Sequence, residues 1–229
     1  MQKSSLKRKI LVISLVAALI AVISAGTLAW FTATDTVGNE FKVAIDGNGD
    51  PDFDIDLIEH KPDGNEPSLP STEITGEGDD PTGITYETIA PGDLYSKDPT
   101  VRNTGSYDAW IRVRVTLDQA SVWKTALGNH PAMSPDPAQI LKTVDDTVWV
   151  RAENLEDATN DTITFVFYKL TPLAAGDEVT LFTQVGIPSE FTNADMTFAS
   201  GTFRVDVHAD AIQSRNTGNS AAEAFALID

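Results

Sequence analysis

The sequence predicts an all-β protein, an antiparallel β-sandwich of jelly-roll or Ig-like type with short inserted helices, preceded by an N-terminal signal peptide helix. Apolar and polar residues alternate in many short segments, turn residues separate these segments, and only a few stretches have a helical pattern. The clearest strand is 109–117, where one face collects the branched aliphatic residues Ile111, Val113, Val115 and Leu117. A second long strand is predicted over 202–212. About eight or nine strands with such turns are typical of a sandwich.

The N-terminus has the pattern of an export signal. Residues 1–9 are basic and residues 10–25 are apolar, and small residues, Thr27 and Ala29, then stand at positions −3 and −1 before Trp30. This arrangement predicts cleavage that leaves Trp30 as the first residue of the mature protein. The alternative is a retained membrane anchor, because the charge-free segment is long enough at ~1.5 Å per residue to cross a ~30 Å apolar core. Either way, the rest of the chain lies outside the cytoplasmic membrane.

The remaining elements follow from local patterns. Three parts are expected: a signal peptide at 1–29, an N-terminal strand segment at 30–45, and a β-sandwich domain at 46–229 with a long acidic, exposed loop at 60–83. Further strands are predicted at 53–57, 84–89, 99–102, 147–151, 162–170 and 178–185. Helices are predicted at 119–127, with Asp118 as its cap, and at 137–144 and 220–227.

Charge and composition exclude several functional classes. The chain has 229 residues, 16 Lys and Arg, 34 Asp and Glu, and no Cys. The four basic residues of 1–29 leave 12 basic against 34 acidic residues in the remainder, a formal charge of −22. Such a polyanion repels phosphate backbones, so we expect no nucleic-acid binding. Without a thiol there is no cysteine nucleophile, disulfide or Cys-ligated metal site.

The sequence predicts no enzyme. His60, His130 and His208 are scattered and none belongs to a His-Glu-x-x-His motif, which would place two ligands on one helical face. A Gly-x-Ser-x-Gly nucleophile elbow and a phosphate-binding loop are also missing from the sequence.

An acidic turn is the candidate metal site. Oxygen-bearing side chains recur at every second position, at Asp46, Asn48, Asp50 and Asp52. This spacing resembles the start of an EF-hand loop, although Pro51 replaces the required Gly and Leu57 replaces the final Glu. Two interpretations stay open: a partial calcium site at a sheet edge, or a solvated acidic turn.

Three segments together resemble the TasA/camelysin family of exported Gram-positive proteins. They are the junction 26–32 followed by Asp35 and 39–41, the Pro-Gly-Asp and Asn-Thr-Gly unit within 89–117, and the final strand around 209–213. The resemblance implies a jelly-roll fold, processing by a SipW-type signal peptidase, and a secreted biofilm-matrix or cell-surface protein. It also implies self-association into fibres in which an N-terminal strand completes the sheet of the next subunit. Camelysin is described as a metalloprotease, which is the remaining enzymatic alternative.

The functional expectation is therefore an exported, non-enzymatic fibre subunit. Its donor strand is expected within 30–45, where Phe41, Val43 and Ile45 share one apolar face. The alternative is that this strand pairs within its own subunit. A monomeric secreted or anchored module that binds calcium, a glycan or a surface partner is the second functional class.

Overall fold

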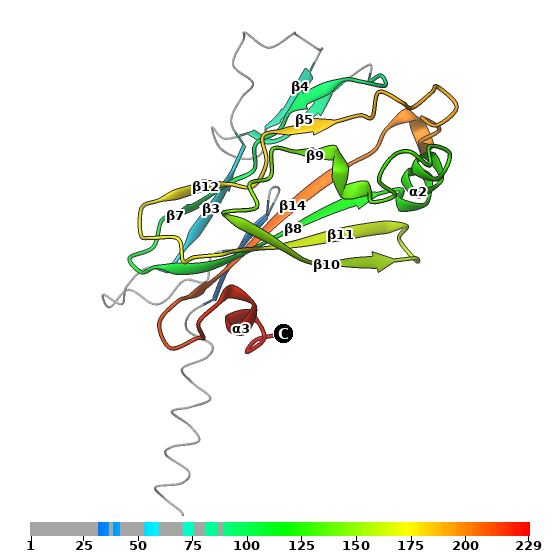
Figure 1. Cartoon of the computed structure of the whole chain (residues 1–229). Coiled ribbons are helices and arrows are strands. Elements are labelled where there is room, and N and C mark those ends of the chain that lie inside the picture. Colours follow the sequence, from blue (N-terminus) through cyan, green and yellow to red (C-terminus); the bar gives the residue numbers. More distant parts are fainter. Residues whose placement is uncertain (1–31, 37–38, 42–52, 60–70, 76–80, 87–88) are drawn as a thin grey trace, which may run out of the picture.

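A computed structural model shows a mostly β protein with antiparallel sheets and few short helices (Figure 1). It describes residues 32–36, 39–41, 53–59, 71–75, 81–86 and 89–229. The largest sheet has six strands in the order β10-β11-β8-β14-β1-β2. Their bounds are β10 Trp149–Asp157, β11 Thr162–Lys169, β8 Ala109–Asp118, β14 Val205–Gln213, β1 Thr32–Thr36 and β2 Asn39–Phe41.

Smaller sheets accompany this large sheet. One has the order β12-β7-β3, built from Glu178–Thr180, Thr100–Asn103 and Ile55–Ile58. Another has the order β6-β13-β9, built from Leu94–Ser96, Gln184–Gly186 and Leu141–Lys142. The last is the pair β4, Ser71–Thr75, and β5, Pro81–Tyr86.

The alternation in β8 is confirmed. Residues 111, 113, 115 and 117 are fully buried, whereas Arg112, Arg114 and Thr116 are only half-buried on the other face. β8 lies between β11 and β14, and both pairings are antiparallel. The central position explains the continuous apolar face, because each neighbouring strand adds its own buried row beside that of β8.

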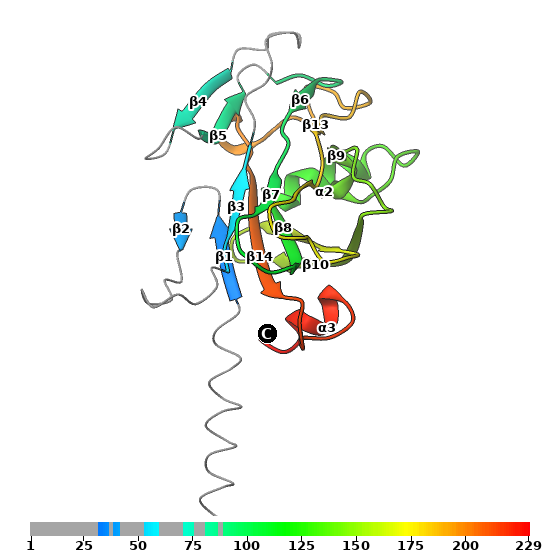
Figure 2. The same cartoon turned by 90° about the vertical axis from the view of Figure 1, so that its left-hand side faces the viewer.

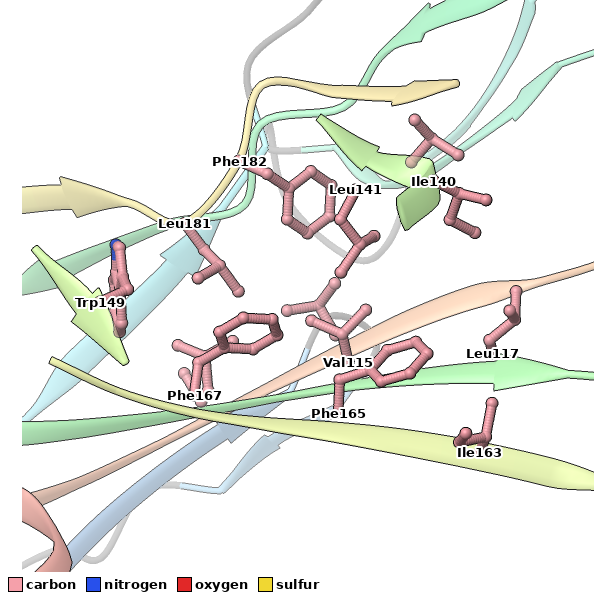
Figure 3. Close-up of a cluster of buried hydrophobic side chains, with 14 of the residues drawn as sticks. Val115, Leu117, Ile140, Leu141, Trp149, Ile163, Phe165, Phe167, Leu181 and Phe182 are labelled. Carbon is pink, nitrogen blue, oxygen red and sulfur yellow. The ribbon is translucent and has the colours of Figure 1, made fainter. Parts of the chain in front are cut away.

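The core lies between the six-stranded sheet and the smaller sheets. Figure 3 shows Val115, Phe165 and Phe167 pointing from the large sheet toward Leu141, Leu181 and Phe182 on the other side. All six are buried, and each such side chain contributes ~1.5–3 kcal/mol of hydrophobic stabilisation relative to exposure. This shared core fixes the position of β8, and through β8 that of β14 and β1.

The two short helices lie at separate places around the large sheet (Figure 1). α2, Ala120–Gly128, lies where a helix was predicted, but the prediction that Asp118 caps this helix is wrong, because Gln119 is the N-cap residue. Gln119 has a left-handed backbone with φ of 52°, so the chain turns and Asp118 accepts a hydrogen bond from the Arg204 N–H instead. Asp161 takes over the cap, accepting from the Ser121 N–H and hydroxyl.

The C-terminal helix α3, Ala221–Phe225, confirms the helix predicted over 220–227 in a shorter form. The Ser220 hydroxyl accepts from the Glu223 N–H, and the Glu223 carboxylate accepts from the Asn219 N–H. These reciprocal bonds define a capping box. The segment predicted as a helix at 137–144 is a 3-10 turn, Pro137–Ile140, followed directly by β9.

Two sequence expectations need correction. The stretch 60–83 is not wholly a loop, because β4 and the start of β5 form an antiparallel hairpin within it. The β-branched residues Thr72, Ile74 and Thr75 in β4 favour that strand despite the acidic surroundings. The strand predicted at 178–185 is divided between two sheets, since Leu181 and Phe182 turn into the core between β12 and β13.

Candidate assembly edge of the six-stranded sheet

The N-terminal strands form one edge region of the large sheet (Figure 2). β1 pairs with β14 over five residues, from Thr32 opposite Ile212 to Thr36 opposite His208. β2 then pairs with β1, so that Phe41 stands opposite Thr34. The first described strand of the chain, β1, therefore pairs with β14, which is the last strand along the chain.

Small residues make up β1, whose sequence is Thr-Ala-Thr-Asp-Thr. No residue in this strand has a large apolar side chain, so its attachment to β14 depends mainly on main-chain hydrogen bonds. Such pairing tolerates exchange of one strand for another of the same sequence. By contrast, β14 is also fixed by nine paired positions along β8.

A charged network lies on the outer face of β14, at the positions opposite β1. Asp210 is only 5% exposed, and its carboxylate accepts from Arg112 Nε at 2.8 Å and Arg114 Nη2 at 3.1 Å. His208 Nε2 lies 2.9 Å from the same carboxylate. In register, Asp210 is opposite Thr34 and His208 is opposite Thr36. The network thus ties β8 to β14 directly beside the β1 pairing.

The electrostatics of Asp210 favour its charged form. Burial by itself raises the pKa of this carboxyl, but the hydrogen bond from His208 and the charges of Arg114, His208 and Arg112 outweigh it and lower the pKa to about 2. Asp210 is therefore ionised at neutral pH. Its charge compensates that of Arg114 and, together with Asp229, that of Arg112.

The C-terminal residues pack on the same face of β8 and β14 as the Asp210 network. The side-chain carboxylate of Asp229 accepts from Arg112 Nη1 at 2.6 Å, and the Arg112 guanidinium lies 4.4 Å from the centre of the Phe225 ring. A second apolar cluster lies between α3 and the large sheet. It is formed by Ala221, Ala224 and Phe225 of α3 together with Trp110 of β8 and Ile212 of β14. Arg112 thus connects the C-terminal helix to the network under β1.

A second carboxylate–histidine pair lies far from this edge. Asp195 accepts from Asn129 Nδ2 at 2.9 Å and from the Thr192 N–H at 2.8 Å, and it lies 3.1 Å from His130 Nε2. These bonds hold the pKa of Asp195 well below its usual value. His130 also stacks on Phe191. The pair joins the end of α2 to the 191–195 loop and has the character of a structural clamp.

The predicted site residues are only partly placed. Phe41 lies at the end of β2. The other positions lie outside the described residues, namely Thr27, Ala29 and Trp30 at the cleavage site, Val43 and Ile45 of the donor strand, and Asp46, Asn48, Asp50 and Asp52 of the acidic turn. Within the ranges that the structure describes, no three metal-ligating side chains are grouped together. Within those same ranges, no helix has the length and apolarity needed to cross a membrane.

Sequence reasoning missed the network around Asp210. Its members occupy polar positions on strands whose other face is apolar, which by itself indicates only a solvated surface. Arg112 and Arg114 are almost one hundred positions from Asp210 in the chain. Their meeting depends on the register of β8 against β14, which the sequence pattern does not specify.

The chain matches no protein-family model, no curated protein and no solved structure. Its own geometry and sequence patterns therefore carry the functional inference.

Proposed function

We propose that this protein is an exported, non-enzymatic structural subunit of extracellular biofilm-matrix or cell-surface fibres of a Gram-positive bacterium. The observation that carries the proposal is the position of β1. This strand follows the apolar N-terminal segment within a few residues and pairs with β14 through residues with small side chains. A strand attached in this way is suited to exchange between identical subunits.

The proposed fold is a β-sandwich of jelly-roll or Ig-like type. A large antiparallel sheet with smaller sheets across one common core supports it. In this arrangement β14 can keep its place through β8 after β1 has left, because β8 supplies the buried face and Asp210 supplies the ionic link.

Export provides the trigger. Before cleavage, β1 is continuous with a segment that is held by the membrane. A SipW-type signal peptidase that acts after Ala29 releases Trp30 and frees the segment 30–45. The acidic turn that starts at Asp46 directly follows this segment, and calcium bound there would fix where the exchanged segment ends.

Exchange generates an open chain of subunits. β1 of one subunit takes the place of β1 beside β14 of the next, and Phe41, Val43 and Ile45 contribute an apolar face to the same contact. Such head-to-tail contacts do not close on themselves and yield filaments. The formal charge of −22 on the body opposes assembly, and salt relieves it because exposed charges are screened beyond ~8 Å at physiological ionic strength.

Two single-cysteine variants test the exchange directly, because the chain has no cysteine of its own. Ala33 in β1 stands opposite Ala211 in β14. One batch of mature protein carries Ala33→Cys and the other carries Ala211→Cys, and the two are mixed under assembly conditions with a mild oxidant. We expect disulfide-linked heterodimers on a non-reducing gel, together with filaments in negative-stain micrographs.

The matched control moves one cysteine by two positions along the same face. Ala209→Cys is opposite position 35, so a cysteine at 33 is ~7–8 Å away, which is too far for an unstrained disulfide. This pair is expected to give little cross-linking. Monomers that never cross-link between chains, at high concentration and high salt, would reject exchange and favour the monomeric binding module.

A further inference from the structure

A lysine and a glutamate form a buried pair away from the assembly edge. Glu59 directly follows β3, and Lys97 lies in the connection from β6 to β7. Lys97 Nζ contacts Glu59 Oε1, and the two side chains are 13% and 1% exposed. The Lys97 N–H donates to the Thr183 carbonyl, which fixes the backbone of this connection.

This pair is poorly compensated as an ion pair. Glu59 Oε2 is buried and has no hydrogen-bond partner among the residues that the structure describes. Burying two charges is costly unless further hydrogen bonds satisfy the remaining lone pairs of the carboxylate. The exposed pair Lys124–Glu156, with side chains 40% and 59% exposed, has water available for the same purpose. The buried Lys97–Glu59 contact therefore leaves one carboxylate oxygen of Glu59 without a compensating hydrogen bond among the described residues.

We propose that Lys97 and Glu59 are joined by an isopeptide bond between Lys97 Nζ and Glu59 Cδ. Transfer of one proton from the ammonium to the carboxylate gives a neutral amine and a carboxylic acid. The nitrogen lone pair attacks Cδ, the Cδ–O bond to the protonated oxygen breaks, and that oxygen leaves as water with a proton from nitrogen. One amine and one acid become one amide and one water, with no oxidant or other reactant.

Position and confinement favour this step. The two groups are already in contact, so the reaction is intramolecular and needs no encounter. The low exposure of both side chains limits access of water, which would otherwise reverse it. The amide carries no charge, so the penalty of burying an incompletely paired carboxylate disappears.

The bond would close a covalent loop around the segment 60–96. That segment contains the β4–β5 hairpin, and its two ends are Glu59 beside β3 and Lys97 before β7. In a chain without cysteine, such a bond holds β3 in place as a disulfide would. The bond would form in a single chain whether or not fibres assemble, so the mass of the chain and the covalent joining of its fragments are sufficient to detect it.

Intact mass spectrometry of the denatured full chain tests the bond. The chain is expected to be lighter than its sequence mass by one water molecule. Lys97→Arg keeps the positive charge but replaces the amine, and it should restore the full sequence mass. The matched control Lys124→Arg alters the exposed pair and should keep the loss of water.

Proteolysis locates the bond independently. A glutamate-specific protease cuts within 60–96 and elsewhere in the chain. Under denaturing conditions the peptide that contains Glu59 should stay joined to the peptide that contains Lys97 in the wild type, whereas the two should separate in Lys97→Arg. A wild-type chain with its full sequence mass overturns the proposal without any variant. Loss of water that persists in Lys97→Arg would place the modification elsewhere and would equally overturn it.

Discussion

The two edges of the six-stranded sheet are built in opposite ways. The β10 edge has nine residues, a register shift between Arg151 and Glu153 where it pairs with β11, and many charged side chains. Two ion pairs join β10 to residues outside the sheet: Arg151 pairs with Asp136, and Glu156 pairs with Lys124. At the other end of the sheet, the short strand β2 is the edge strand, and β1, which has only small residues, lies between β2 and β14.

The comparison indicates which edge can associate. Bulges and charges on an edge strand are devices that prevent addition of another strand, and β10 has both. β1 has a paired neighbour on each side and contributes no large apolar side chain. The bulge and charges of β10 therefore suit it to remain an edge strand. The weak attachment of β1 to β14 suits β1 to strand exchange.

The largest effect is expected at Asp210. Asp210→Asn removes the charge that compensates Arg112 and Arg114 and should lower the free energy of unfolding by ~3–5 kcal/mol, as for one partner of a buried ion pair. Urea unfolding measures the change. The control Asp206→Asn, on the same strand but in an exposed pair with Arg204, should change it by less than ~1 kcal/mol. Equal effects of the two substitutions would show that the network does not hold β14.

Acid should weaken the same network. The folded-state pKa of Asp210 is about 2, below its usual value of 3.8, so its contribution is present above pH ~4 and is lost as the pH falls toward ~2. The shift corresponds to about 2 kcal/mol. The difference in unfolding free energy between wild type and Asp210→Asn, measured across this range, should shrink by that amount. A difference that is constant with pH would contradict the assigned pKa.

These elements also show what a single sequence can predict. Strict alternation identified β8 and β14, because one face of each is apolar and buried while polar residues recur at the alternate positions. It found β10 only near Trp149, since the rest of that strand is exposed on both faces and has no alternation to detect. The hairpin of β4 and β5 was hidden by acidic and breaker residues around it.

The candidate site depended even more on tertiary structure. Polar positions on strands were visible in the sequence, but their partners were not. Arg112 meets Asp210 through strand register, and it meets Asp229 through the return of the C-terminal helix. Likewise Glu59 and Lys97 come together only because β3 pairs with β7. Local periodicity has no information on such long-range contacts.

A proline in β1 separates assembly from folding. Thr34 pairs with β14 on one side and β2 on the other, so Thr34→Pro removes a ladder hydrogen bond whichever way its N–H points. Because β1 has small residues only, the unfolding free energy should fall by no more than ~1–2 kcal/mol, while filaments disappear. Circular dichroism and negative-stain microscopy on one preparation measure both. Filaments of normal length in Thr34→Pro would rule out β1 as the exchanged strand.

The smallest effect is expected at the opposite edge. Leu155 in β10 is an exposed apolar residue, and Leu155→Lys adds a positive charge beside Glu156 on a strand that already has four charged residues. Since the side chain lies outside the core, the unfolding free energy should change by less than ~0.5 kcal/mol. Filaments should form as in the wild type, because exchange uses the β1 edge. If Leu155→Lys instead abolishes filaments while the fold is retained, then β10 is the contact surface, and the contrast between the two edges is reversed.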